Sequence, residues 1–192
     1  MSMWNLPTSL SVGGVGYFIR TDFRVILDIL DAYNDPDNDP EERSLICLWS
    51  LYEDAESIPP EHYQEALEKA VEFIDAGFEP DSSNKSRPTL MDWEQDAPLI
   101  IPAVNRVAGR EIRSMEYLHW WTFLGYYMEI GESLFTQVIS IREKKAKGKK
   151  LEKYEREFYN ENKRIITLKH KESQREKEEK DAVRELFGYK KR

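Results

Sequence analysis

Apolar side chains are densest in residues 115–130, MEYLHWWTFLGYYMEI, where polar or small residues form only a narrow strip. A helix that is apolar on nearly every side must be buried on nearly every side. This stretch therefore predicts a central helix against which the other helices pack, with Ser114 as its N-cap and Gly131 as its stop. It is too short to span a bilayer. The side chains that we expect to organise the core are Trp120, Trp121, Phe123 and Leu124.

Shorter patterns flank this central stretch. Residues 8–20 alternate around Gly13-Gly14 and predict a β-hairpin, because a tight hairpin turn needs residues that accept a positive φ. Apolar residues at steps of three and four then predict helices over residues 22–33, 40–52, 60–76, 98–108 and 132–145. Within these helices, the side chains expected to face the core include Leu45, Trp49, Val71 and Leu134.

An acidic turn precedes the second of these helices. Asp35, Asp37 and Asp39 have the spacing of the first calcium ligands of an EF-hand. The loop fails that test, because Pro40 stands where a turn glycine is required and Ile46 where a bidentate glutamate is required. We therefore interpret Asp39 as the N-cap of the next helix, with Pro40 at its first position.

The C-terminal quarter differs from the rest of the chain. After a basic hinge at residues 144–150, an apolar seam interrupted by Asn162 predicts one long helix from Leu151. Residues 169–181 contain no apolar side chain, and an apolar tip follows. Two interpretations of the tip stay open: it docks a partner, or it folds back on its own domain. The side chains expected to contact a partner are Leu151, Tyr154, Phe158, Ile165 and Leu168 of the seam and Val183, Leu186, Phe187 and Tyr189 of the tip.

Together these patterns predict a mainly α fold. We expect a helical bundle around a central aromatic-rich helix, with a short N-terminal β-hairpin and a long charged C-terminal helix. The expected division is a helical domain with its hairpin over residues 1–145, followed by the hinge and extended charged tail over residues 146–192.

Charge is distributed unevenly along the 192-residue chain, whose net charge is -8. Residues 1–100 contain 6 Lys and Arg against 21 Asp and Glu, whereas residues 101–192 contain 22 against 15. Two interpretations stay open. Either the charges improve solubility, or they promote association. In the second case the acidic head attracts the basic tail of another subunit, or the basic tail attracts an acidic partner. The acidic head argues against nucleic acid as the main ligand.

The sequence contains no recognisable catalytic or metal-binding motif. Its three histidines lie on different segments, and none has further ligands at zinc-binding spacing. His119 is expected on the polar strip of the central helix beside Glu116. The single cysteine, Cys47, falls inside a predicted helix without a basic neighbour, so we expect an inert core thiol in a reducing compartment. We expect no enzymatic activity, no cofactor and no metal.

Three blocks carry a family resemblance: Asp92-Trp-Glu-Gln-Asp96, Leu118-His-Trp-Trp-Thr-Phe123 and Ile139-Ser-Ile-Arg142. Over roughly residues 5–165 the chain resembles the bacteriophage gene-product-fifteen family of tailed phages and prophages of Gram-positive hosts. Members of that family are encoded in the tail module, near the major tail protein and the tape-measure protein.

The resemblance implies a non-enzymatic tail assembly chaperone. Such a protein would bind the tape-measure protein, tail-tube subunits or both in the host bacterial cytoplasm, without a membrane. Self-association into a homo-oligomer also stays open. The alternatives are a structural tail component retained in the virion and a nucleic-acid-associated protein that uses the basic segment of residues 142–192.

Overall fold

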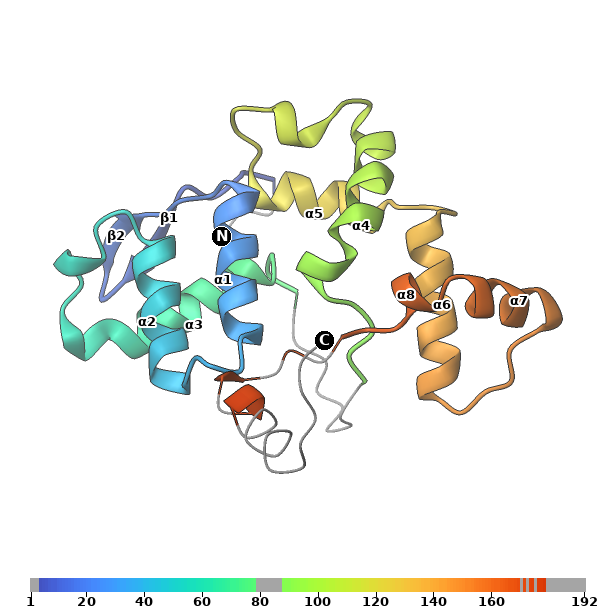
Figure 1. The fold of residues 1–192 in the computed structure, drawn as a ribbon. Helices are drawn as coiled ribbons and strands as arrows, with labels where there is room; N and C mark the ends of the chain where they lie inside the picture. The colour runs from blue at the N-terminus through green and yellow to red at the C-terminus, as the bar shows by residue number, and fades with distance from the viewer. Residues whose placement is uncertain (1–3, 79–87, 170, 172, 175, 179–192) are drawn as a thin grey trace.

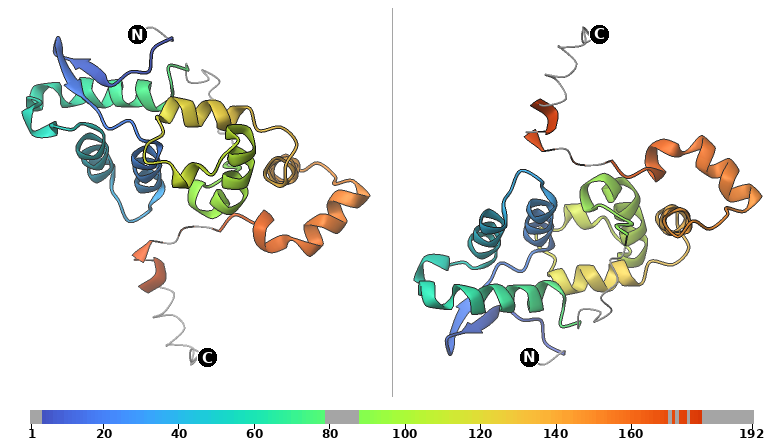
Figure 2. Two further views of the ribbon diagram at one scale, coloured as in Figure 1. Left: turned by 90° about the horizontal axis from the view of Figure 1, so that it is seen from above. Right: turned by 90° about the horizontal axis from the view of Figure 1, so that it is seen from below.

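The computed structural model describes residues 4–78, 88–169, 171, 173, 174 and 176–178. In chain order its elements are β1 (Ser9–Val12), β2 (Val15–Phe18), α1 (Phe23–Asn34), α2 (Pro40–Leu51), η1 (Ala55–Ser57), η2 (Pro60–His62), α3 (Tyr63–Ile74), α4 (Trp93–Ala108), η3 (Ile112–Ser114), α5 (Trp120–Met128), α6 (Leu134–Ala146), α7 (Lys153–Glu161) and α8 (Lys163–Ile166). The predicted mainly α fold with a short N-terminal hairpin is confirmed. The hairpin and α1–α3 lie at one end, α4 and α5 in the middle, and α6–α8 at the other end (Figures 1 and 2).

The N-terminal hairpin forms where the sequence predicts it. Gly13 and Gly14 occupy the turn with φ values of 56° and 78°. Leu10 and Val12 point away from solvent and are buried, and β1 contacts α3. The hairpin thus gains from tertiary packing the stability that an isolated two-stranded hairpin lacks.

Replacing Gly13 with alanine is expected to destabilise the protein more than replacing Gly14. Both positions have positive φ, which costs a residue with a Cβ roughly 1–2 kcal/mol. A Cβ on Gly13 would also lie 2.7 Å from Nε2 of His62, whereas nothing lies within 4 Å of a Cβ on Gly14. Urea unfolding should therefore show an additional loss for Gly13→Ala. Equal losses would contradict the close approach of His62 to the turn.

Side-chain hydrogen bonds cap both ends of α2. Asp39 accepts hydrogen bonds from the N–H groups of Glu41 and Glu42, and the Glu42 carboxylate accepts one from the Asp39 N–H. This capping box confirms Asp39 as the N-cap of α2. At the other end of α2, the Arg20 guanidinium donates to backbone carbonyl oxygens between residues 49 and 53. Those carbonyls have few partners within the helix, so Arg20 stabilises its C-terminus.

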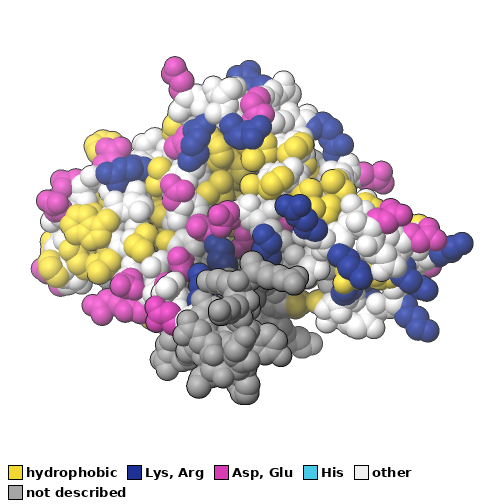
Figure 3. Space-filling view, viewed as in Figure 1, with side chains coloured by type: hydrophobic (Ala, Val, Ile, Leu, Met, Phe, Trp, Pro, Cys, Tyr) yellow, Lys and Arg dark blue, Asp and Glu magenta, His cyan; other side chains and the backbone are white. Residues whose placement is uncertain are grey.

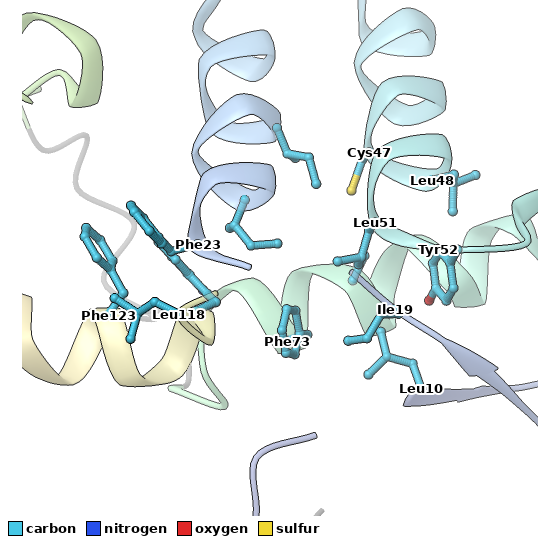
Figure 4. Close-up of a cluster of buried hydrophobic side chains, with 14 of the residues drawn as sticks. Leu10, Ile19, Phe23, Cys47, Leu48, Leu51, Tyr52, Phe73, Leu118 and Phe123 are labelled. Carbon is cyan, nitrogen blue, oxygen red and sulfur yellow. The ribbon is translucent and has the colours of Figure 1, made fainter. Parts of the chain in front are cut away.

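The main hydrophobic core lies between α1, α2, α3 and α5 (Figure 4). Phe23 of α1 stacks on Phe123 of α5, with ring centroids 4.7 Å apart. Phe73 of α3 and Leu118 complete this part of the core. Among the expected organisers of the core, Trp120 and Phe123 are almost completely buried. Trp121 and Leu124 are half-buried.

Two tryptophans join α5 to the end of α3. The indole N–H groups of Trp120 and Trp121 donate to the carbonyl oxygens of Ile74 and Phe73, each at 2.8 Å. The last carbonyls of a helix have no partner in the helical ladder, and Trp120 supplies a donor to that of Ile74. The carbonyl of Phe73 also accepts from the N–H of Ala76 at 3.0 Å, so Trp121 gives it a second donor. The two tryptophans therefore hold α5 against α3 through both apolar contact and hydrogen bonds.

The central helix is shorter than predicted. The backbone of Leu118 donates to Oδ2 of Asp22 at 3.0 Å and accepts from the N–H of Phe23 at 2.9 Å. Because Leu118 pairs with the start of α1, it is extended, and α5 begins only after His119. The predicted N-cap at Ser114 is therefore wrong.

The segment after Leu151 is not the single long helix that its seam predicts. Asn162 separates α7 from α8, and its Nδ2 donates to the carbonyl oxygen of Phe158 at 3.0 Å. An asparagine side chain that bonds nearby backbone competes with the helical ladder. After this break α8 packs on α6, where a second small core contains Val138, Ile141 and Ile166. The division of the chain at residues 145 and 146 stays a prediction.

Four predicted core side chains lie at the surface instead. Leu45, Trp49, Val71 and Leu134 are between 41% and 47% exposed. On α2 the buried face consists of Cys47, Leu48 and Leu51. The helix contacts α1 and α3, and Leu45 and Trp49 lie outside the fully buried face and stay partly exposed. They leave apolar surface on a strongly charged exterior.

Candidate partner-binding surfaces

The predicted contact residues of the apolar seam do not form one exposed stripe. Tyr154 is 62% exposed, whereas Leu151, Phe158 and Ile165 are half-buried against the second core. Leu168, beyond α8, is half-buried as well. The seam thus anchors the C-terminal segment to α6 and leaves Tyr154 accessible. The predicted tip residues lie outside the described residues; they are Val183, Leu186, Phe187 and Tyr189.

A buried ion pair fastens this C-terminal segment to the middle of the molecule. The side chains of Arg142 and Asp96 are 5% and 1% exposed, and two parallel hydrogen bonds of 2.6 and 2.8 Å join them. The other N–H groups of the guanidinium donate to the carbonyl oxygens of Leu90, Ile165 and Ile166. All five donors of the arginine are therefore used. One side chain holds α4, α6 and α8 together.

Apolar spacing alone does not indicate this ion pair, although the sequence carries a signal for it. Asp96 and Arg142 end two of the blocks that resemble the phage family, residues 92–96 and 139–142. Each charged residue also occupies a helical face that is otherwise apolar. Because charges are rarely buried unpaired, a charge on such a face indicates an ion pair with another element. Sequence alone does not say which residue is its partner.

Beyond α8 the chain crosses from α4 to α1. The Gln95 side chain donates to the carbonyl oxygen of Thr167 at 2.9 Å and accepts from the N–H of Lys169 at 2.8 Å. The Lys171 ammonium then pairs with Asp31 and lies 3.4 Å from Glu94. A cleft of about 640 Å³ lies here, with charged side chains on both walls; its lining includes Asp31, Glu94, Gln95, Lys169 and Lys171. Its polar lining suits charged groups rather than apolar side chains.

An apolar groove lies between α4 and the start of α6. Its volume of about 220 Å³ is below that of typical small-molecule sites, roughly 300–1,000 Å³, so it suits the side chains of a protein partner. Figure 3 shows apolar surface in this region. The sequence signal that could have indicated it is a pair of prolines one helical turn apart. The groove is lined by Pro98, Leu99, Pro102, Ala103, Arg106, Ser133 and Leu134.

Candidate chemistry is sparse in the described part of the chain. Its residues include no group of three or more His, Cys, Asp or Glu arranged to hold a metal ion. Its helices include none long and apolar enough to cross a bilayer. Cys47 is completely buried, and burial raises the pKa of its thiol to about 11. The thiol is therefore protonated at neutral pH and a poor nucleophile.

His119 is the N-cap of α5 rather than a residue on a polar strip inside the helix. Its Nδ1 accepts a hydrogen bond from the N–H of Trp121 at 3.0 Å, so the proton of the neutral ring lies on Nε2. Nε2 then donates to the carbonyl oxygen of Pro7, also at 3.0 Å. Burial lowers the pKa of His119 below the ordinary histidine value, and the bond to Pro7 opposes this shift only in part.

Acidification is expected to destabilise the protein through His119. In the unfolded chain this histidine binds a proton near pH 6.5, whereas in the folded chain its lowered pKa delays protonation. The unfolded state therefore holds more protons as the pH falls below 6.5, and stability falls with it. His119→Asn keeps a side-chain cap and removes the titration. Urea unfolding at several pH values should show a shallower pH dependence for this variant. An unchanged dependence would contradict the role of His119.

Comparison with known proteins identifies a family for this chain. A model of the family described as Bacteriophage Gp15 protein matches residues 4–168. The match extends from the N-terminal hairpin to just beyond α8, so it includes the groove, the buried ion pair and the docked C-terminal segment. No curated protein sequence and no solved structure matches the chain.

Proposed function

The chain belongs to the Bacteriophage Gp15 protein family and is a phage structural or morphogenesis protein, and from this premise we propose that it is a non-enzymatic tail assembly chaperone. It would act in the host bacterial cytoplasm, bind the tape-measure protein or tail-tube subunits during tail morphogenesis, and need no cofactor. The family match over residues 4–168 is the observation that carries this proposal.

The surface of the molecule supports the proposal. A chaperone for an apolar helical client needs accessible apolar contacts on a surface that keeps the complex in solution. The groove between α4 and α6 offers such contacts, with Leu134 46% exposed at one wall. Arg106 beside it supplies a positive charge for an acidic residue of the client. One third of all residues in the chain are charged, which provides the solubilising surface.

Co-expression with the tape-measure protein from the same genome tests the proposal. Size-exclusion chromatography with light scattering should show a soluble tape-measure protein that co-elutes with this chain. If the tape-measure protein stays insoluble while this chain elutes alone, the chaperone proposal fails. Mass spectrometry of purified virions then tests the alternative of a structural component, which should be present in the particle.

Leu134→Asp is expected to weaken client binding at least tenfold, because it places a charge in the apolar groove. Leu134 is the first residue of α6, where an aspartate interacts favourably with the helix dipole, so the fold should tolerate it. Val71→Asp is the matched control. It changes an apolar side chain of similar exposure on α3, outside the groove. Equal binding by both variants in a quantitative pull-down would exclude the groove as the client site.

The seam and tip remain a second predicted site for clients. A chain ending at Lys150 is a poor test of it, because the truncation would uncover Val138 and Ile141 and remove two carbonyl partners of Arg142. Tyr154→Ala is a more specific test of this site, because most of that side chain is exposed and its removal should leave the packing of the segment intact. A client affinity unchanged in this variant would argue against α7 as the contact.

The arrangement of the basic residues disfavours nucleic acid as the main ligand. Lys144 pairs with Glu155, Lys147 pairs with Glu143, and Lys145 lies 3.6 Å above the ring of Tyr159. These lysines are engaged within the chain. Any binding to DNA or RNA should fall steeply with added salt.

A further inference from the structure

The two ends of the molecule carry opposite charge. Residues 4–78, which form the hairpin and α1–α3, contain 4 Lys and Arg against 16 Asp and Glu, a net of -12. Residues 134–166, which form α6–α8, contain 10 Lys and Arg against 5 Glu, a net of +5. Figures 1 and 2 place these groups of helices at opposite ends, with α4 and α5 between them. The chain therefore presents complementary fields in opposite directions.

The acidic end also exposes apolar side chains on α2. Leu45 and Trp49 lie one helical turn apart and are 41% and 45% exposed. Glu41 lies one turn before Leu45, next to Glu42, and both glutamates are exposed. Figure 3 shows apolar surface at this end of the molecule. We call these four residues the α2 patch: an exposed indole and a leucine beside two carboxylates.

The basic end exposes an aromatic side chain among lysines. Tyr154, near the start of α7, is 62% exposed. Lys149, Lys150 and Lys153 precede it and are exposed as well. We call these four residues the α7 patch. It has the composition that would complement the α2 patch, with an aromatic anchor and opposite charge.

We propose that the α2 patch of one copy binds the α7 patch of another, so that the protein self-associates head to tail. The two patches cannot meet within one molecule, because α4 and α5 separate the ends that carry them (Figure 2). Opposite charges steer the ends together, and lysines that approach Trp49 add cation–π attraction. Trp49 and Tyr154 are the residue types that most often anchor interfaces. Because the two surfaces differ, the contact is heterologous and produces a ring or a filament rather than a closed dimer.

The full-length chain alone tests this proposal, so the outcome is independent of the client experiment. Sedimentation velocity over roughly 1 µM to 1 mM, the range in which small transient interfaces dissociate, should show a mass that rises with concentration beyond the dimer. Raising the salt concentration should weaken the association several-fold, since exposed charges are screened. A chain that stays monomeric over this range at low salt would overturn the proposal.

Two variants separate head-to-tail association from other kinds. Leu45→Ala with Trp49→Ala removes the α2 patch, and Lys153→Glu with Tyr154→Ala removes the α7 patch. Each variant alone should associate at least tenfold more weakly than the natural chain. Their equimolar mixture should form a 1:1 complex and stop there, because only one intact pair of patches remains.

Two further variants and a measurement of folding serve as controls for these outcomes. Val71→Ala with Met128→Ala removes exposed apolar surface elsewhere and should associate like the natural chain. Glu41→Lys tests the charge without touching a packed side chain and should also weaken association. Circular dichroism identifies any variant that fails to fold. Normal association of either patch variant, or no complex in their mixture, would overturn the proposal.

Discussion

Arg142→Met is expected to lower the free energy of unfolding by about 3–5 kcal/mol, which is the usual loss when one partner of a buried ion pair is removed. The variant leaves the Asp96 carboxylate buried without its main partner. It also leaves the carbonyl oxygens of Ile165 and Ile166 without the donors that hold α8 against α6. Urea unfolding followed by circular dichroism measures the loss. Hydrogen exchange should show faster exchange from α8 in particular.

Arg113→Met is the matched control for this prediction. Arg113 also binds a carboxylate through two N–H groups, those of Nε and Nη2, to Glu111. Its side chain is 63% exposed, so solvent screens the pair and replaces it when it is removed. The loss should be far smaller than for Arg142→Met. Adding Asp96→Leu to Arg142→Met should restore part of the stability, because no unpaired charge then remains buried. Equal losses for the two arginine variants would contradict the structural role of the buried pair.

Trp120→Ala is expected to lower the free energy of unfolding by about 3–5 kcal/mol, as large-to-small substitutions of core aromatics do. Trp120 is 2% exposed and stacks on Phe123 at a centroid distance of 5.6 Å. Its indole N–H also donates to the carbonyl oxygen of Ile74 at the end of α3. The variant therefore creates a cavity and leaves a carbonyl without its donor. Thermal and urea unfolding measure the change.

Leu124→Ala, on the same helix, is the control for that prediction. Leu124 is only half-buried and supplies no hydrogen bond, so the expected loss is about 1–2 kcal/mol. Trp120→Phe retains much of the apolar volume but removes the indole N–H, so its loss should lie between the two. If Trp120→Ala and Leu124→Ala lose the same stability, Trp120 does not organise the core.

The buried pair and the proposed surfaces are connected through the same helices. Arg142 lies on α6, whose first residue forms one wall of the apolar groove, and it also fixes α8, which follows the α7 patch. A loss of client binding or self-association in Arg142→Met would therefore reflect displaced helices. Surface variants at Leu134 and Tyr154 test the contacts themselves without disturbing that framework.

The local features of this protein follow from its sequence. The hairpin turn at Gly13-Gly14 needs residues that adopt positive φ, and the cap at Asp39 needs an acceptor beside the first turn of a helix. Both depend on neighbours within a few residues, so the sequence by itself determines them. The mainly α class follows from apolar spacing in the same way. The blocks at residues 92–96, 118–123 and 139–142 also indicated the family that the match over residues 4–168 establishes.

Only the tertiary structure decided which elements stop early and which faces are covered. The central helix starts after His119 because Leu118 pairs with the beginning of α1, almost a hundred residues earlier in the chain. Leu45 and Trp49 carry helical apolar spacing, yet in the described part of the chain only Cys47, Leu48 and Leu51 of α2 are fully buried. Asp96 and Arg142 lie 46 residues apart in the sequence, and only the tertiary structure shows that they form an ion pair. Apolar spacing reports which side chains favour burial, but a helix has more apolar positions than one contact can cover, and the three-dimensional arrangement of its partners selects among them.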